Sequence, residues 1–282
     1  MKLVECPRDA MQGLHEFIPT DLKASYINLL LQVGFDTLDF GSFVSPKAIP
    51  QMRDTAGVLS KLDLSASSTK LLAIVANLRG IEEAVQYDEI IYLGFPFSIS
   101  ETFQQRNTNS GIRESLVTVE KLVELAARHH KTPVIYLSMA FGNPYGDAWN
   151  IEIAEHWAAE LVKRGVVILS LADTVGSAQP GDIETLFSSL AVTFPAAELG
   201  VHLHSTPASW REKIDAAYSA GCRRFDSALK GYGGCPMASD VLTGNIATEN
   251  LLAYLAEKKD LPGINYSKWQ EAMDLSGKVF LR

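Results

Sequence analysis

Short apolar runs recur along the chain, and an amphipathic stretch follows most of them. Several runs are apolar at successive positions, as expected for strands that are buried on both faces. The expected strands are Lys2–Cys6, Thr37–Phe40, Leu71–Ala76, Ile90–Leu93, Pro133–Ser138, Val166–Leu171, Leu199–His204 and Arg224–Ser227. Helices are expected over Asp21–Val33, Ile81–Gln86, Ile112–Arg128, Trp149–Lys163, Gly181–Ala191 and Trp210–Ala220. Gly34, Gly165 and Gly221 stand where helices should end.

The alternation of strand and helix predicts a parallel sheet, and eight such units predict a closed (β/α)₈ TIM barrel. A length of 282 residues suits one catalytic domain over residues 1–282, with Thr248–Arg282 forming closing helices. A doubly wound open sheet is the alternative, but no Gly-x-Gly-x-x-Gly follows the first strand. The length also permits two smaller domains, although no Pro/Gly/Ser-rich linker divides the chain.

Composition narrows the function classes. Apolar residues make up 47% and charged residues 21%, which is typical of a globular protein. A net charge of −8 argues against a nucleic-acid binder but leaves room for a small anionic ligand. Cys6, Cys222 and Cys235 are too few and too scattered for a disulfide framework, and an odd number fits a reducing compartment. Without a signal segment or a membrane-length apolar run, we expect a cytoplasmic protein that does not bind membranes.

Two histidines are the strongest candidates for chemistry. His202 and His204 stand two apart in a stretch that runs from a strand into a loop. Side chains at that spacing point to the same face of a strand. Two adjacent imidazoles suit a divalent metal whose other ligands come from elsewhere in the chain. The alternative is a pair of ordinary polar residues at a strand end.

Further polar residues follow the other expected strands. In a TIM barrel the active site lies at the carboxyl ends of the strands. Each group alone also fits an ordinary surface pair, helix cap or turn. Their occurrence at the same end of successive strands predicts a site built from Arg8-Asp9, Asp39, Ser42–Lys47, Asn77, Arg79, Ser170–Thr174, Gly231–Pro236 and Gly244-Asn245.

Taken together, these motifs resemble the 3-hydroxy-3-methylglutaryl-CoA (HMG-CoA) lyase family of metal-dependent barrels. The resemblance spans about residues 3–256 and rests on Pro7-Arg8-Asp9, Ser42–Lys47 with Pro50-Gln51-Met52, Asp173-Thr174, His202-x-His204, Gly233–Pro236 and Gly244-Asn245-x-Ala247-Thr248-Glu249. It implies cleavage of HMG-CoA to acetyl-CoA and acetoacetate, as in leucine degradation and ketone-body formation. It also implies an acyl-CoA as the bound partner, Mg²⁺ or Mn²⁺ as cofactor, and a homodimer.

The resemblance also implies roles for individual residues. The metal ligands would be Asp9, His202, His204 and Asn245. The catalytic residues would be Arg8, Cys235, Asp173 and His202, with Arg8 polarising the thioester carbonyl, Cys235 on a mobile glycine-rich loop and Asp173 next to the reacting hydroxyl. Substrate contacts would come from Arg8, Gln12, Asp39 and Asn77.

The chemistry of the reaction agrees with these roles. Cleaving a 3-hydroxyacyl thioester between C2 and C3 requires a base for the hydroxyl proton and a Lewis acid to hold the alkoxide. A fixed cation such as Arg8 stabilises the thioester enolate that results. An acid must then protonate the enolate carbon, and the Cys235 thiol is able to donate. Mixed nitrogen and oxygen ligands leave the identity of the metal open.

Several positions depart from the family pattern. Cys6 stands where the family usually has glycine, Gly13 replaces asparagine, Asp39 replaces glutamate and Ser205 replaces aspartate; the nearby acidic residue, Glu5, is shifted by one place. These changes leave a lyase or aldolase for a different 3-hydroxy acid or acyl-CoA as the main alternative. A Claisen synthase of the same superfamily usually carries a long carboxyl-terminal extension. A metal-binding barrel without catalysis would not need Arg8, Asp173 and Cys235 together.

Overall fold

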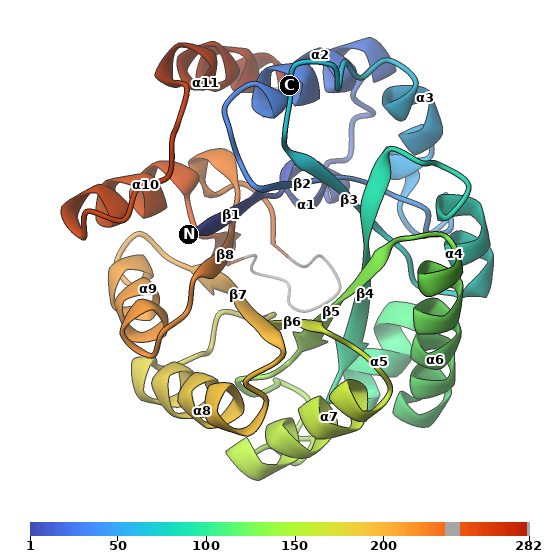
Figure 1. The fold of residues 1–282 in the computed structure, drawn as a ribbon, viewed down its shortest axis with the longest axis vertical. Helices are drawn as coiled ribbons and strands as arrows, with labels where there is room; N and C mark the ends of the chain where they lie inside the picture. The colour runs from blue at the N-terminus through green and yellow to red at the C-terminus, as the bar shows by residue number, and fades with distance from the viewer. Residues whose placement is uncertain (235–242, 281–282) are drawn as a thin grey trace.

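The computed structural model describes residues 1–234 and 243–280, and its centre is a closed barrel of parallel strands (Figure 1). Each strand pairs in parallel with the next along the chain, and β8 pairs with β1 to close the ring. The predicted (β/α)₈ fold is therefore confirmed. The barrel strands are β1 (Lys2–Glu5), β2 (Thr37–Ser42), β3 (Lys70–Ile74), β4 (Ile90–Ser98), β5 (Thr132–Ser138), β6 (Ile168–Asp173), β7 (Glu198–Ser205) and β8 (Arg224–Ser227).

Helices surround the barrel on its outside, as Figure 1 shows. The α-helices are α1 (Pro7–Gln12), α2 (Thr20–Leu31), α3 (Thr55–Leu59), α4 (Leu78–Ala84), α5 (Glu101–Thr108), α6 (Ile112–Arg128), α7 (Ile151–Lys163), α8 (Pro180–Thr193), α9 (Trp210–Ser219), α10 (Thr248–Glu257) and α11 (Tyr266–Phe280). The expected helices are all present, and α6 and β8 have the expected bounds. The expected closing helices are α10 and α11, and α11 packs against α2 through an edge-on contact of Tyr26 with Phe280.

Of the α-helices in the described residues, the sequence interpretation missed three short ones, of which α1 affects the site. Arg8 and Asp9 were expected at the end of the first strand, but β1 ends at Glu5 and both residues lie in the first turn of α1. Pro7 starts this helix, which suits proline because the first helical residue needs no N–H donor. Six residues are too few to show a helical periodicity, so the pattern gave no sign of α1. The other two missed helices are α3 and α5.

The barrel wall separates two cores. Along β7, Leu199, Val201 and Leu203 belong to the large apolar core between the strands and the helices. A smaller cluster, made of Leu72, Ile74, Tyr92, Val134, Tyr136 and Ile168, belongs to a separate core. The two histidines of β7 alternate with its apolar residues, and they face the barrel interior. The interior also carries buried charged side chains, among them Arg224 and Asp226 on β8.

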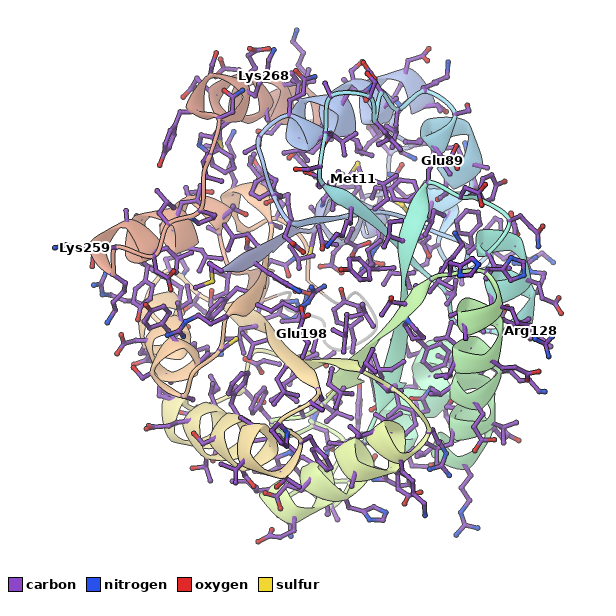
Figure 2. All side chains as sticks on the ribbon, viewed as in Figure 1. Met11, Glu89, Arg128, Glu198, Lys259 and Lys268 are labelled. Atoms are coloured by element: carbon purple, nitrogen blue, oxygen red, sulfur yellow. The ribbon has the colours of Figure 1, made fainter. Side chains whose placement is uncertain are left out.

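The two ends of the barrel differ in what they present. Viewed along the barrel, Figure 2 places Glu198, at the start of β7, in the middle of the ring, whereas Arg128, Lys259 and Lys268 extend from its rim. The opposite ends of the strands lead into α1, α5 and Asn77 at the start of α4, which line the cavity described next. Within the described ranges no helix combines the length and apolar character needed to cross a membrane.

Candidate active site

A cavity of about 420 Å³ opens at the carboxyl ends of the strands. The end of α5, from Phe103 to Asn109, forms one wall, and Tyr136 and Ile74 of the inner barrel core also line it. Of the residues that the resemblance assigned to metal, catalysis or substrate, six line this cavity: Arg8, Asp9, Gln12, Asn77, His202 and His204. Asp39, Asp173 and Asn245 are not among the lining residues, and Cys235 lies outside the described residues.

Asp9, His202 and His204 form a group suited to a metal. One ligand atom from each of the three lies within 4.8 Å of the others. The Nδ1 atom of His204 lies 3.0 Å from the carbonyl oxygen of Thr174, which only accepts, so Nδ1 carries the proton and Nε2 has a free lone pair. That Nε2 atom is buried and has no hydrogen-bond partner within residues 1–234 and 243–280. A divalent cation binds to a free nitrogen lone pair and to a carboxylate oxygen, and this group offers both. These residues therefore fit the metal that the resemblance implies.

Asn245 completes the ring of polar groups around Asp9. It lies on β9 (Gly244–Asn245), which pairs antiparallel with β7 so that Asn245 stands opposite His204. Its side-chain nitrogen donates to Oδ2 of Asp9 at 2.7 Å and to the carbonyl of Tyr232 at 2.9 Å. Asn245 is therefore next to the predicted site, but its nitrogen faces Asp9. Ligation by Asn245 requires the amide oxygen to turn toward the ion.

The charge of Asp9 is favoured by its surroundings. Burial alone would raise the pKa of Asp9, but the neighbouring Arg8, the two histidines and the hydrogen bond from Asn245 together lower it. Burial lowers the pKa of His204, which keeps that imidazole neutral. A carboxylate and a neutral imidazole are the protonation states that bind a metal.

Arg8 is held by hydrogen bonds from all of its side-chain nitrogens. Nε donates to both carboxylate oxygens of Asp39, at 3.2 and 3.1 Å, and Nη2 donates to the same carboxylate. Nη1 donates to Asp9 at 3.1 Å and to Gln12 at 2.9 Å. The amide nitrogen of Gln12 in turn donates to Asp9 at 2.7 Å. The guanidinium is thereby fixed in the cavity wall beside the candidate metal group.

Asp39 has a different position from the one predicted. It was expected to bind substrate, but it is buried, does not line the cavity, and uses its carboxylate to hold Arg8. Burial raises the pKa of Asp39 to about 6, even though the Arg8 guanidinium acts in the opposite direction. The other predicted substrate contact, Asn77, does line the cavity, and its oxygen caps α4 by accepting from the backbone N–H of Gly80 at 3.0 Å.

Asp173 does not lie where the reacting hydroxyl was expected. Ala172 and Thr174 line the cavity, whereas Asp173, between them on β6, points to the opposite side of the barrel wall. Its carboxylate accepts from Nζ of Lys213 at 2.7 Å and from the backbone N–H of Ala178 at 3.0 Å. Lys213 also donates to the carbonyl of His204 at 2.9 Å. Asp173 therefore fixes the ends of β6 and β7 rather than contacting the cavity.

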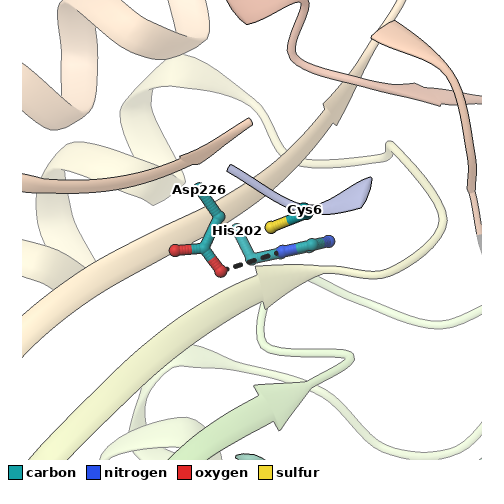
Figure 3. Close-up of side chains that lie close together, drawn as sticks. All are labelled: Cys6, His202 and Asp226. Atoms are coloured by element: carbon teal, nitrogen blue, oxygen red, sulfur yellow. Dashed lines mark hydrogen bonds and ion pairs between the residues drawn. The ribbon is translucent and has the colours of Figure 1, made fainter. Parts of the chain in front are cut away.

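The sequence interpretation missed Asp226, whose carboxylate orients the ring of His202. His202 and Asp226 are register partners on β7 and β8, and Nδ1 of His202 lies 3.1 Å from Oδ2 of Asp226 (Figure 3). Although burial acts to lower it, this carboxylate raises the pKa of His202. A signal was available, because two parallel strands that follow each other in a barrel place their inward residues side by side.

Cys6 lies beside the same pair, as Figure 3 shows. Cys6, His202 and Asp226 form a second group with ligand atoms within 4.8 Å of one another. Burial, with the surrounding carboxylates, raises the pKa of the Cys6 thiol well above its usual value. A neutral thiol is a poor metal ligand, so of the two groups we consider Asp9, His202 and His204 the better metal site.

A closed barrel with a buried carboxylate–histidine group and a fixed arginine at one cavity defines a TIM-barrel enzyme whose residues suit a metal. Comparison with known proteins identifies the family: residues 3–276 match the HMGL-like family, and the chain belongs to it. As a member, it is a carbon–carbon lyase. The chain is 35% identical to the cytoplasmic 3-hydroxy-3-methylglutaryl-CoA lyase of Rattus norvegicus, over 99% of this chain and 81% of that protein.

Solved structures give the same answer. An HMG-CoA lyase from Bacillus subtilis superposes with a TM-score of 0.91 at 31% identity, over 100% of this chain and 94% of that one. An HMG-CoA lyase from Acinetobacter baumannii, in complex with coenzyme A and 3-methylmalate, gives a TM-score of 0.90 at 28% identity over 100% and 91%. The family that the motifs suggested is therefore confirmed.

Proposed function

We propose that this protein cleaves HMG-CoA to acetyl-CoA and acetoacetate with the help of a divalent cation. The observation that carries the proposal is the fixed Arg8 guanidinium, which donates to Asp9 of the candidate metal group in the wall of one cavity. A 3-hydroxyacyl thioester presents a hydroxyl and a thioester carbonyl close together. The candidate metal group would hold the hydroxyl oxygen, and the Arg8 guanidinium would face the thioester carbonyl oxygen. The related A. baumannii enzyme, bound to coenzyme A and a hydroxy acid, supports this class of substrate.

We infer that Asp9, His202 and His204 hold the cation, with Asn245 as a fourth ligand once its amide is turned. When bound, Mg²⁺ or Mn²⁺ supplies Lewis acidity that stabilises the alkoxide of the substrate. The protein prepares the site in advance, because Asp226 and the Thr174 carbonyl fix the two imidazole rings through their Nδ1 atoms. Few side-chain rotations are then needed on binding.

Arg8 is proposed to stabilise the enolate of acetyl-CoA that forms when the C2–C3 bond breaks. Its three donor nitrogens are oriented by Asp39, Asp9 and Gln12, so the positive charge stands ready where negative charge develops. Such preorganisation lowers the barrier without binding the ground state more tightly. Asp39 is thus a positioning residue and not a substrate contact.

The proton steps require an acid for the enolate carbon and a base for the hydroxyl. We retain Cys235 as the proposed acid on the strength of the family resemblance. Asp173 is not proposed as the base, because its carboxylate is occupied by Lys213 and Ala178 on the far side of the barrel wall. Asp173 instead keeps the ends of β6 and β7 together, which positions His204.

The proposal is tested with purified protein, Mn²⁺ or Mg²⁺, and a panel of 3-hydroxyacyl-CoA thioesters. We expect equimolar acetyl-CoA and acetoacetate from HMG-CoA, and loss of the reaction with a chelator. Release of acetyl-CoA from another 3-hydroxyacyl-CoA alone would replace the substrate and keep the reaction. An expected homodimer and a cytoplasmic location stay predictions, to be measured by sedimentation and by localisation of the tagged protein.

The metal site has its own test. His202→Ala should lower both Mn²⁺ affinity and turnover by orders of magnitude, because it removes a ligand. Lys163→Ala, which changes an exposed residue of α7 outside the cavity lining, serves as the control. Normal Mn²⁺ occupancy with normal activity in the His202→Ala variant would rule out the ligand assignment.

A further inference from the structure

A buried lysine, Lys213, joins the carboxyl ends of two barrel strands from outside the barrel. It lies on α9, which packs against β7 (Figure 1). Its side chain is only 3% exposed. Nζ donates to the Asp173 carboxylate at 2.7 Å and to the carbonyl oxygens of Gly176 and His204, both at 2.9 Å. An ammonium group has three N–H donors, so each has one acceptor here and the direction of the group is fixed.

Packing alone does not require a lysine at this position. The other buried residues of α9, Ile214 and Ala217, are apolar. Withdrawing an ammonium group and a carboxylate from water is costly, and replacing a buried ion pair by apolar side chains is often neutral or stabilising. Lys213 provides what an apolar residue does not, which is a set of hydrogen bonds to the ends of β6 and β7. The value of the lysine therefore lies in what these strand ends carry.

The strand ends carry both halves of the hydrogen bond that orients His204. The ring of His204, near the end of β7, directs Nδ1 to the carbonyl oxygen of Thr174 at 3.0 Å. Thr174 directly follows Asp173, the last residue of β6. Lys213 donates to the backbone of His204 on one side. On the other side it donates to Asp173 and Gly176, which stand before and after Thr174. One ammonium group thus sets the imidazole and its acceptor relative to each other.

The turn after β6 is itself folded around Asp173. The backbone N–H of Gly176 donates to the carbonyl of Asp173 at 3.1 Å, and that of Ala178 donates to its carboxylate at 3.0 Å. The hydroxyl of Thr174 accepts from the backbone N–H of Met139 at 2.9 Å, which connects the turn to the chain just beyond β5. These bonds make the turn a compact unit, so its contacts with Lys213 determine where the Thr174 carbonyl lies.

We propose that Lys213 is a positioning residue for His204, because it holds the imidazole in the tautomer and direction that leave Nε2 free for a metal ion. This inference rests on the proposed role of His204 as a metal ligand. Histidines that bind metals commonly donate their other ring nitrogen to a carbonyl or carboxylate, which fixes the ring. Here the Thr174 carbonyl is that group, and Lys213 keeps it in place. His202 provides an internal comparison, because its ring is held by Asp226 on β8.

The first measurement is the histidine nitrogen NMR spectrum of the metal-free full-length protein, with the His204 signals assigned by a His204→Ala variant. In the original chain Nδ1 of His204 should carry the proton and Nε2 should not. Lys213→Met keeps most of the length of the side chain but removes all three donors. We expect the His204 signals to move toward the average of two exchanging tautomers. Those of His202 should not change, because Asp226 still holds that ring.

The second measurement is Mn²⁺ binding, followed by the electron paramagnetic resonance signal of free Mn²⁺. Lys213→Met should weaken binding about 10- to 100-fold, the range seen when groups that orient metal ligands are lost. If this variant does not fold, Asp173→Asn replaces it. The amide keeps the shape of the carboxylate but turns an N–H group toward either Lys213 or Ala178. We expect several-fold weaker binding from it, with the same change in the His204 signals.

Lys131 is the matched control for the loss of a buried ammonium group. It too is buried, and Nζ donates to the carbonyl oxygens of Tyr87 at 2.6 Å and Ile90 at 2.7 Å. It precedes β5 and therefore lies at the opposite end of the barrel from the cavity. Lys131→Met should lower the melting temperature and leave both the His204 signals and the Mn²⁺ dissociation constant unchanged.

Four results would decide the matter. A folded Lys213→Met or Asp173→Asn variant with unchanged His204 signals overturns the inference, whatever its affinity for Mn²⁺. Equal changes at His202 and His204 also overturn it, because the disturbance would then be general. Changed His204 signals with an unchanged Mn²⁺ affinity would overturn the role in metal binding. If the original chain binds Mn²⁺ no better than His204→Ala, the proposed metal site itself has failed, whereas the histidine spectra still show whether Lys213 holds the ring.

Discussion

Two buried arginines inside the barrel are held in different ways. Arg8, at the cavity, directs all of its side-chain nitrogens to Asp39, Asp9 and Gln12. Arg224, below the cavity, donates from Nη1 to Glu198 and has Asp36 at 4.0 Å from the same atom, whereas among the described residues its Nε and Nη2 atoms have no hydrogen-bond partner. Hydrogen bonds fix the direction in which Arg8 presents its donors, whereas packing against Gly200 fixes only where the charge of Arg224 lies.

The difference bears on what each residue can do. A group that meets a developing oxyanion must present its donors within a few tenths of an ångström, and a network of hydrogen bonds provides that precision. A group that supports another side chain through its charge has a weaker requirement, because Coulomb energy changes slowly with distance and direction. Variants that keep charge but change donor geometry should therefore affect the two arginines unequally.

The largest effect is expected from Arg8→Lys. Lysine keeps the positive charge but not the planar set of donors that binds Asp39, Asp9 and Gln12 at once. We expect kcat to fall about 10³-fold, with a small change in KM, as measured by steady-state kinetics. The same change at Arg224 should alter kcat only a few-fold. A variant in which only KM rises would show that Arg8 binds the ground state.

Asp39→Asn tests whether the partners of Arg8 matter as much as Arg8 itself. The amide keeps the shape of the side chain but removes the charge that anchors Arg8. We expect kcat to fall about 10- to 100-fold, as for other residues that orient a catalytic group.

The pKa of Asp39, about 6, adds a pH signature. As pH falls through this value the carboxylate becomes neutral and the ion pair with Arg8 is lost, so turnover should decline on the acid side. This acid limb should be absent from the pH profile of Asp39→Asn. An unchanged limb would assign it to another group.

Gly200→Ala disturbs the packing of Arg224 and nothing at Arg8. Because the added Cβ meets the arginine stem at 2.9 Å, we expect the free energy of unfolding to fall by about 1–3 kcal/mol, the usual cost of overpacking. Gly181→Ala is the matched control, since a Cβ there has no heavy atom within 4 Å. Urea titrations of both variants measure the difference. Equal stability of the two variants would show that Gly200 does not constrain Arg224.

Glu5 is another buried acidic side chain, and in the described part of the chain it has hydrogen bonds but no ion pair. Its oxygens accept from the backbone N–H of Leu229 at 2.8 Å and from the hydroxyl of Thr248 at 2.6 Å. Burial nevertheless raises the pKa of Glu5 to about 8. The folded protein therefore binds a proton here that the unfolded chain releases near its ordinary pKa of about 4.3.

The sign of the resulting pH effect follows from this difference. The stabilising contribution is fully present below the unfolded pKa and is lost as pH rises toward 8, by at most about 1.4 kcal/mol for each pH unit. Glu5→Gln imitates the protonated acid, so its unfolding free energy should vary less between pH 5 and pH 8. Urea titrations at three pH values measure this, and parallel curves for both proteins would contradict the expected proton uptake.

The fold and the histidine pair of the site were predictable because they depend on local periodicity. Alternating strands and helices predicted the barrel, and the spacing of His202 and His204 predicted two imidazoles on one face. Asp173 was misplaced because the same alternation was not applied to β6, where Ala172 and Thr174 face the cavity. Successive side chains of a strand face opposite sides of the sheet, so the position of a residue in its strand decides whether it reaches the site. A sequence motif alone does not give this information.

Asp226 and Arg224 needed knowledge of more than one strand. Their importance comes from the register of β7 against β8 and from the space left by Gly200. The two charged residues of the short strand β8, on either side of Phe225, were visible in the sequence, but nothing local distinguished the inside of the barrel from its outside. Likewise the role of Asp39 in holding Arg8 was missed, because the two residues are 31 positions apart and their contact depends on the short helix α1.

The hydrogen bond between Asn245 and Asp9 joins residues 236 positions apart in the chain. During synthesis Asp9 is translated long before its partner Asn245. Until β8 is translated, β2 is the only barrel neighbour available to β1. The proposed ion-binding group is therefore complete only after Asn245 has been translated and the ring has closed. Metal uptake by a ribosome-bound nascent chain would accordingly report the moment of ring closure, and a growing chain would be protected from premature loading.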